Sequence, residues 1–214
     1  MPSLAEDLLL LLLDDESGRS VVNGTSRDQA VAGAVLLDLV RLGRISSTAD
    51  DPGKGRLVVE DASPTGDPVF DTALSTLAGK PVRTDAAVQR LSRGCVRVVL
   101  DRLVARGLVR QERTRVLGLF PVTSWPAADA THEAELRQRL DAVLLRDAEP
   151  DERTGCLIAL LHAATAVTKV VPGDRARVRA RAKEIAQGNW AAAAVKKAID
   201  SVTAVVVTVV TTAT

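Results

Sequence analysis

Aromatic side chains are almost absent from this sequence of 214 residues. Phe, Trp and Tyr together make up 2% of the chain and there is no Tyr, whereas hydrophobic residues make up 46%. A chain of this length and apolar content can bury a substantial core, so that core must be mainly aliphatic. The two cysteines, Cys95 and Cys156, stand alone in apolar contexts. We therefore expect small buried thiols and no disulfide, as in a cytosolic protein.

Long hydrophobic runs are also lacking. The longest leucine run covers residues 8–13 and has acidic residues on both sides, at 6–7 and at 14–16. A secretory signal needs a basic start and a longer apolar segment. Six helical residues rise only about 9 Å, against a hydrocarbon core of about 30 Å. The apolar tail, residues 201–214, is also shorter than the roughly 20 residues of a membrane span. The expected location is therefore the cytoplasm.

Recognisable catalytic and metal-binding motifs are missing as well. The sequence has no HExxH, CxxC or GxSxG, and the turn around Lys54 lacks the first Gly and the Ser/Thr of a phosphate-binding loop. His132 and His162 are isolated from each other, and a core histidine is the favoured interpretation of His162. Asp67 and Asp71 flank a helix start, where capping explains them. We predict a protein that is not an enzyme and that has no cofactor and no metal.

Helical periodicity accounts for most of the chain. Ser3 and Glu6 form the pattern of a capping box, which predicts a first helix over 4–13 that is apolar nearly all round and therefore buried. The spacing of apolar residues predicts further helices over 28–42, 69–77, 84–106 (as one or two helices), 130–145, 153–167 and 175–186. An Ala-rich helix follows from residue 190, and the Val/Thr-rich tail leaves helix and strand open.

Strand patterns are short and few. They predict strands over 44–46 and 56–61, and a β-hairpin formed by 108–113 and 116–123 around Thr114–Arg115. Because no repeat or low-complexity linker interrupts the chain, the predicted fold class is mostly α, a single helical domain over residues 1–214 with a hairpin and a few short strands.

The charge of this chain is unevenly distributed although its net value is only +1. Residues 83–115 contain nine arginines against three acids, while residues 6–16 are acidic. On a helix, Arg90, Arg93 and Arg97 fall at i, i+3 and i+7 and share one face. Three guanidinium groups on one face match phosphate oxygens. The alternative is a solvated face with salt bridges to the acidic N-terminal segment, and the pattern alone leaves both open.

Apolar residues lie beside this basic segment. Val116, Leu117, Leu119 and Phe120 fall in or near the tip of the predicted hairpin. An apolar tip next to a cationic face is typical of a peripheral membrane protein, because basic residues are attracted to anionic lipid and apolar side chains enter the interface. The alternative is that these side chains pack on the domain or on a second copy of the chain.

The same region has a second functional interpretation. A helix followed by RGLV and a hairpin, residues 96–123, is also the outline of a winged-helix DNA-binding module. The wing would be apolar here, whereas a DNA-contacting wing is usually basic or polar. Nucleic acid is therefore the less favoured partner.

Six segments in order carry a family resemblance. They are LAEDLLLLLLDDESGR (4–19), AGAVLLDLVRLGRI (32–45), SPTGDPVFDTAL (63–74), LVARGLVRQE (103–112), LGLFPVTSWP (117–126) and RTGCLIALLHA (153–163). With them the chain resembles the Golgi phosphoprotein 3 family, including its bacterial relatives, and the excess of Arg over Lys suggests a GC-rich, actinobacterial genome. The resemblance implies one compact helical domain with a protruding β-hairpin. It also implies a peripheral membrane protein that binds phosphatidylinositol 4-phosphate and, in eukaryotes, helps to retain Golgi glycosyltransferases.

Only some positions that the resemblance assigns to the family's headgroup pocket have the family's residue in this sequence. A family Trp matches Asn23, and a family Arg matches Ala32. Of two family arginines on the basic helix, one matches Arg93, and the other falls at Val96 with Arg97 next to it. The resemblance thus implies a lipid-insertion element that is retained better than the headgroup pocket.

Together these observations predict a non-enzymatic protein on the inner face of the membrane. Anionic headgroups, phosphatidylinositol 4-phosphate-like, would bind Arg90, Arg93, Arg97 and Asn23. The apolar tip (Val116, Leu117, Leu119 and Phe120) would insert into the bilayer or form a homo-oligomer. A protein partner is left open, and the sequence does not name one.

Overall fold

Helices dominate the computed structural model, which describes residues 2–48, 56–116 and 120–187. The helices are α1 (Leu4–Leu11), α2 (Gly24–Arg41), α3 (Pro68–Leu77), α4 (Thr84–Ser92), α5 (Cys95–Ala105), α6 (Thr131–Leu145), α7 (Glu152–Ala163), α8 (Val167–Val170) and α9 (Arg175–Gln187). The strands are β1 (Ile45–Ser47), β2 (Arg56–Val59), β3 (Val82–Arg83), β4 (Glu112–Val116) and β5 (Phe120–Ser124). The mostly α fold class with a few short strands is confirmed. The extent of the domain over residues 1–214 stays a prediction, and the helix and tail expected from residue 190 lie outside the described residues.

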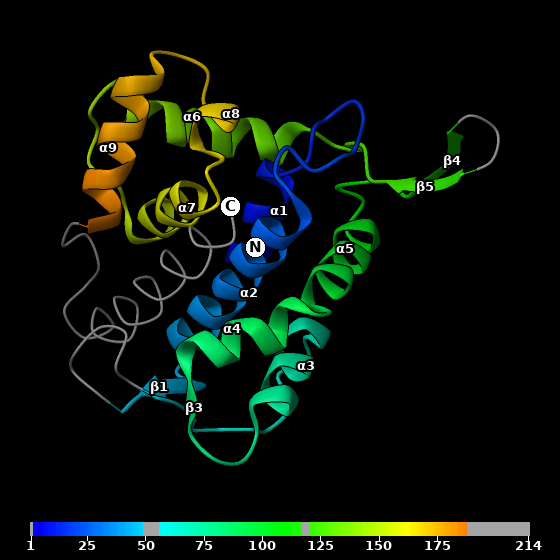
Figure 1. Ribbon diagram of the computed structural model, residues 1–214, viewed down its shortest axis with the longest axis vertical. Helices are drawn as coiled ribbons and strands as arrows, with labels where there is room; N and C mark the ends of the chain where they lie inside the picture. Colours follow the sequence, from blue (N-terminus) through cyan, green and yellow to red (C-terminus); the bar gives the residue numbers. More distant parts are fainter. Residues whose placement is uncertain (1, 49–55, 117–119, 188–214) are drawn as a thin grey trace.

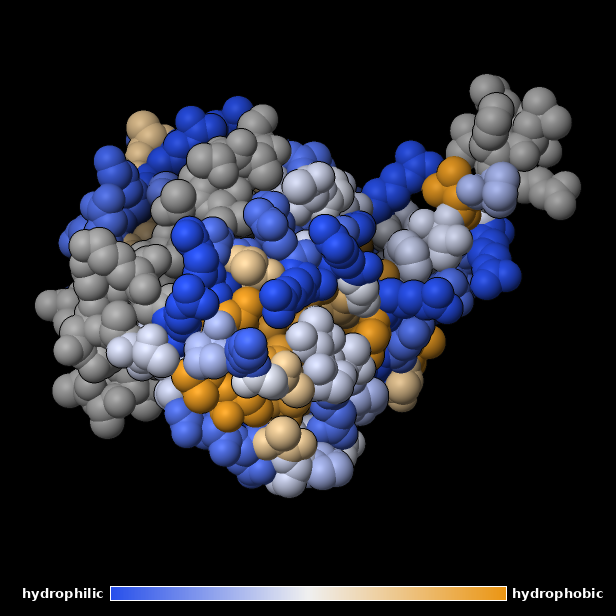
Figure 2. All heavy atoms as spheres, turned by 60° about the horizontal axis from the view of Figure 1, so that its bottom comes forward, coloured by the Kyte–Doolittle hydropathy of each residue, from blue (hydrophilic) through white to orange (hydrophobic). Residues whose placement is uncertain are grey.

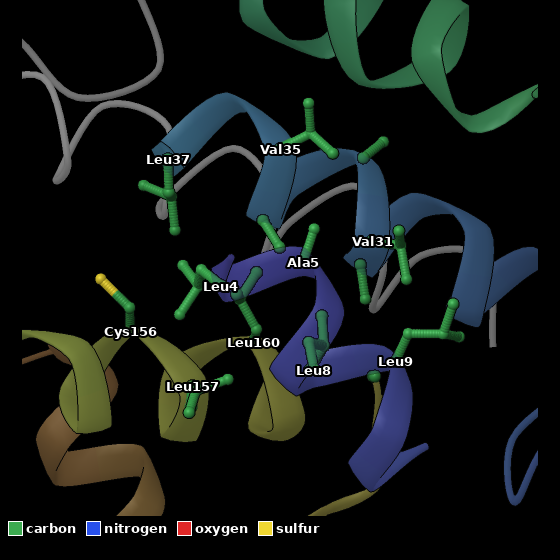
Figure 3. Packing of buried hydrophobic residues seen from close by; sticks show 14 of the residues in the cluster. Leu4, Ala5, Leu8, Leu9, Val31, Val35, Leu37, Cys156, Leu157 and Leu160 are labelled. Atoms are coloured by element: carbon green, nitrogen blue, oxygen red, sulfur yellow. The ribbon is translucent and has the colours of Figure 1, made fainter. Parts of the chain in front are cut away.

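The first helix forms the centre of the core, as its sequence predicts. Ser3 and Glu6 form the expected capping box, and every residue of α1 is buried. Figure 3 shows α1 between α2 and α7, with Leu4 close to Leu160 of α7 and with Val35 on the side of α2 that faces away from α1. Aliphatic side chains fill this cluster. Cys95 and Cys156 are buried and free, and burial raises the pKa of each thiol to about 12, so both are unreactive hydrophobic side chains.

Two acids of α1 and α2 are buried with compensating partners. Glu6 Oε1 accepts from Arg102 Nε at 3.0 Å and lies 2.9 Å from Arg106 Nε. Asp38 accepts hydrogen bonds from the amides of Leu4 and Ala5, so it satisfies two free donors at the start of α1. Burial nevertheless raises the pKa of Asp38 to about 6. The salt bridges proposed between the basic segment and the acidic N-terminus therefore exist for Arg102 and Arg106.

Two helices differ from the sequence-based prediction by four residues at one end. α2 begins four residues early, at Gly24, because the Asn23 side chain accepts a hydrogen bond from the Ser26 amide and caps the helix. The segment over 84–106, expected as one or two helices, forms two, which meet at Gly94. α7 ends at Ala163 and does not reach residue 167, because Thr165 adopts a positive φ of 54° that a right-handed helix cannot contain.

The strands form two small antiparallel sheets. One has the order β1-β2-β3, and its third strand was not predicted from the sequence. The other is the hairpin of β4 and β5, in which Thr114 pairs with Val122 and Arg115 with Pro121. The predicted turn at Thr114–Arg115 is therefore wrong: both residues belong to β4, and the strands are connected by residues 117–119, which lie outside the described residues.

The hairpin protrudes from the helical body, as the family resemblance implies (Figure 1). Its base is held by the turn that follows α1. The Trp125 amide donates to the Gly18 carbonyl at 2.9 Å, and the Ala127 amide donates to the Asp15 carbonyl at 3.0 Å. Gly18 has a φ of 62°, and a Cβ atom placed on it would lie 2.2 Å from Pro126 N. Only glycine therefore fits at the contact that anchors the hairpin.

Replacing Gly18 by alanine should destabilise the protein by about 2–3 kcal/mol, because it adds both backbone strain and a steric clash with the hairpin base. Gly43→Ala is the matched control, since Gly43 has a φ of 67° but no atom lies within 4 Å of an added Cβ. Its expected cost is the strain alone, about 1 kcal/mol. Denaturant unfolding measures the loss of unfolding free energy in both variants. Equal losses would show that the clash with the hairpin base does not contribute.

A buried carboxyl on α6 should make stability depend on pH. Burial is the main cause that raises the pKa of Glu133 from 4.5 to about 7, against the opposing charge of Arg137. The pKa of Glu133 in the folded state is above its value in the unfolded state. Its contribution to the unfolding free energy is therefore complete below pH 4.5 and is lost as the pH rises through 7. As the pH rises from 5 to 8, the unfolding free energy of wild type should fall by on the order of 2 kcal/mol more than that of Glu133→Gln.

Unfolding free energies at pH 5 and pH 8 test this expectation. Glu135→Gln, which removes an exposed carboxyl from the same helix, is the control and should keep the pH dependence of wild type. An unchanged pH dependence in Glu133→Gln would show that this carboxyl is not the group responsible.

Candidate functional site

A cavity of about 550 Å³ lies where α4 meets α5, next to the base of the hairpin. Its charged lining consists of four arginines, Arg27, Arg93, Arg97 and Arg113, and two acids, Asp28 and Asp101. We call this cavity the arginine hollow. The lining also includes Gln111, which precedes β4, Thr123 of β5, and Trp125, which follows β5. The arginine hollow and the protruding hairpin therefore adjoin, and Figure 2 shows hydrophilic residues around the hairpin base.

The break between two helices creates this hollow. α4 ends at Ser92, Arg93 follows as its cap, and Gly94 precedes α5 without a side-chain cap. An added Cβ on Gly94 would meet nothing within 4 Å, so the space in front of the α5 N-terminus is open. Uncapped amides at a helix N-terminus carry partial positive charge. The start of α5 therefore adds to the positive potential of the arginine side chains.

Three arginines of the hollow are available to a ligand. Arg93, Arg97 and Arg113 are exposed, and within the described part of the chain their side chains form no ion pair. Arg27 differs, because it is paired with Asp28 at 2.7 Å. Exposed guanidinium groups without carboxylate partners can offer paired N–H donors to phosphate oxygens. The chemistry that the hollow supports is therefore the binding of an anion.

Only some of the site residues predicted from the sequence lie together in the structure. Arg93 and Arg97 line the arginine hollow, whereas Arg90 lines a separate hollow of about 210 Å³ on the other side of Gly94, with Val69 and Cys95. The expectation of one continuous helix face is wrong, because α4 ends before Arg93. The lipid-binding role of each arginine stays a prediction.

Asn23 has a structural role that the sequence did not predict. It caps α2, is exposed, and is not among the residues that line the arginine hollow. Val96, at a position where the resemblance expects arginine, is buried in the wall of the hollow. The headgroup role assigned to Asn23 stays a prediction without support from its position.

The apolar tip falls largely outside the described residues. Val116 and Phe120 pair with each other at the end of the described hairpin, while Leu117 and Leu119 belong to the segment that is not described. The paired strands place Val116 and Phe120 at the far end of the hairpin from its base, and the insertion or oligomerisation role of the four residues stays a prediction.

Sequence reasoning missed Arg27, Arg113 and Asp101 as parts of the site. Arg27 belongs to the first turn of α2, Arg113 to β4 and Asp101 to α5. They are separated by many residues in the chain, so no local pattern places them together. An excess of arginine was the only available signal, and it does not distinguish Arg113 in the hollow from Arg102, which is paired with Glu6.

Two other kinds of site are not found in the described ranges. No group of three or more His, Cys, Asp or Glu residues in these ranges could hold a metal ion. Within the same ranges, no helix has the length and apolar character to span a bilayer.

Two comparisons with known proteins agree with the resemblance. The family model described as Golgi phosphoprotein 3 (GPP34) matches residues 4–202. The vacuolar protein sorting-associated protein 74 of Eremothecium gossypii is 28% identical over 203 residues, which cover 79% of this chain and 61% of that relative. The matched region thus spans about three fifths of the length of the curated relative.

Proposed function

Because the chain belongs to the Golgi phosphoprotein 3 family, we propose that it is a non-enzymatic peripheral membrane protein that binds anionic phospholipid. The observation that carries the proposal is the position of the arginine hollow, which lies at the base of a protruding hairpin whose far end is apolar in sequence. Both elements can meet one lipid surface. The expected location is the cytoplasmic side of the membrane.

Electrostatic attraction supplies the first part of the affinity. Each Lys or Arg near an anionic bilayer contributes about 1 kcal/mol, so Arg93, Arg97 and Arg113 together would contribute about 3 kcal/mol. That amount alone gives weak, reversible binding, and stable association takes a second signal. Burial of Leu117, Leu119 or Phe120 would add about 1.5–3 kcal/mol for each side chain. The combination of hollow and tip is therefore what makes membrane association favourable.

The preferred headgroup is a finer part of the proposal. A phosphorylated headgroup such as that of phosphatidylinositol 4-phosphate fits the guanidinium groups of the hollow. According to the family resemblance, Asn23 and Ala32 stand where the family pocket has a Trp and an Arg. Here the charge available to a headgroup comes from Arg93, Arg97 and Arg113, because Arg27 is paired with Asp28.

Vesicle flotation tests the proposed function. Wild type should float with vesicles that contain anionic phospholipid and remain at the bottom of the gradient with purely phosphatidylcholine vesicles. Added salt should weaken flotation, because it screens exposed charges. Equal flotation with anionic and neutral vesicles would overturn the proposal.

Leu119→Asp separates membrane insertion from self-association at the apolar tip. If the tip inserts, the charge removes the burial of one leucine and should lower vesicle binding by about tenfold or more, without a change of mass in solution. A lower mass by light scattering with unchanged vesicle binding would instead assign the tip to a homo-oligomer.

The winged-helix interpretation finds little support in the ion pairs of α5. Arg102 and Arg106, which would face DNA on a recognition helix, are paired with the buried carboxylate of Glu6. DNA binding would show a steep salt dependence. A gel-shift experiment at low salt should therefore show no retardation of duplex DNA.

A further inference from the structure

The arginine hollow contains an acid that has no partner in the described residues. Asp101 lies on α5, is exposed, and lines the hollow together with Arg93, Arg97 and Arg113. Its side chain forms neither an ion pair nor a hydrogen bond within the described part of the chain. The other acid of the hollow, Asp28, is in contrast neutralised by Arg27 at 2.7 Å. Among the described residues, Asp101 therefore presents an unpaired carboxylate inside a site whose other unpaired charged side chains are arginines.

A carboxylate in this place changes which anions are bound best. An ionised carboxylate only accepts hydrogen bonds, and it repels a phosphate group that carries nothing but acceptor oxygens. A headgroup that carries hydroxyl or ammonium donors beside its phosphate can accept hydrogen bonds from the arginines through the phosphate. The same headgroup can donate hydrogen bonds to Asp101. Such a headgroup satisfies both kinds of charge in the hollow at once.

The size of the hollow agrees with a headgroup larger than phosphate. Its volume of about 550 Å³ falls within the range of small-molecule sites, about 300–1,000 Å³. Ser92, Gln111 and Thr123 add further polar side chains to the lining. Space and polar groups therefore remain for the donor-bearing part of a ligand.

We propose that Asp101 determines headgroup specificity: it selects phosphorylated headgroups that also carry hydrogen-bond donors, either a polyol or an amine, over bare phosphate esters. This inference rests on the proposed function, since it refines which lipid the same hollow accepts.

Flotation on three kinds of vesicle tests the inference. The vesicles contain phosphatidic acid (bare phosphate), phosphatidylinositol (polyol) or phosphatidylserine (amine), each adjusted to the same measured zeta potential so that surface charge does not differ. Wild type should bind at least one of the two donor-bearing vesicles about fivefold more tightly than phosphatidic acid, roughly the value of one hydrogen bond. Tighter binding to phosphatidylinositol vesicles would identify the polyol as the donor, and tighter binding to phosphatidylserine vesicles would identify the amine.

Asp101→Asn should reduce this preference to less than about twofold, mainly because binding to phosphatidic acid increases once the repulsion is removed. Glu149→Gln is the matched control: it changes the net charge equally, and Glu149 is exposed in the loop between α6 and α7, outside the hollow. This control should keep the wild-type preference.

The possible outcomes separate the inference from the proposed function. Equal binding of wild type to all three vesicles, or an equal increase on all three in Asp101→Asn, would overturn the role of Asp101 while leaving membrane binding intact. Absence of binding to every anionic vesicle would overturn the proposed function and the inference with it.

Discussion

Replacing Arg93 and Arg97 together by glutamate should weaken binding to anionic vesicles by about a thousandfold. Each change removes an attraction of about 1 kcal/mol and adds a repulsion of similar size, so the two changes cost about 4 kcal/mol. Both side chains are exposed and form no ion pair in the described part of the chain, so the double variant should fold as wild type does. Flotation or centrifugation with increasing lipid concentration measures the partition coefficient, and circular dichroism confirms folding.

The matched control reverses two arginines on the opposite side of the molecule. Arg175 and Arg179 are exposed on α9, lie one helical turn apart, and likewise form no ion pair in the described residues. Figure 1 shows α9 at the far side of the body from the hairpin. Arg175→Glu combined with Arg179→Glu changes the net charge equally and should weaken binding by about tenfold or less, because distant charges are screened. Equal losses in both double variants would show that net charge, and not the arginine hollow, drives binding.

Replacing Asp7 by alanine should produce the largest loss of stability, about 3–5 kcal/mol. Asp7 is completely buried at the centre of the molecule, where its two carboxylate oxygens accept from His132 Nε2 and Arg153 Nε, each at 2.8 Å. These partners belong to α6 and α7, so one carboxylate joins three helices. Its removal leaves the partly buried Arg153 charge without its carboxylate partner.

Denaturant unfolding measures this loss as a shift of the midpoint at constant slope. Glu149→Ala, which removes an exposed acid, should change the unfolding free energy by less than about 0.5 kcal/mol. A loss below about 1 kcal/mol in Asp7→Ala would mean that the buried ion pair contributes little beyond its desolvation cost.

The parts of the fold that depend on neighbouring residues could be predicted from the sequence. The capping box of Ser3 and Glu6 and the continuous apolarity of residues 8–13 predict a buried first helix, and the structure has it. Asp67 caps α3 through the Val69 amide, as its position before Pro68 suggests. In both cases the signal lies within one helical turn, where local hydrogen bonds and periodicity determine the structure.

The parts that depend on distant residues could not be predicted. The spacing of Arg90, Arg93 and Arg97 indicates one face only if the helix is continuous, and the break at Gly94 separates Arg90 from the other two. Arg27 and Arg113 reach the same hollow from α2 and β4, which only the tertiary fold brings together. The hairpin register was also missed, because alternation of residue types did not distinguish a turn at Thr114–Arg115 from one three residues later.

Hydrogen–deuterium exchange with and without anionic vesicles tests most directly whether the arginine hollow and the hairpin meet the membrane together. Binding should slow amide exchange in the first turn of α5 and in β4 and β5, and should leave α9 unchanged. Slower exchange on α9 without any change at the hollow and the hairpin would contradict this orientation and the membrane-binding account that depends on it.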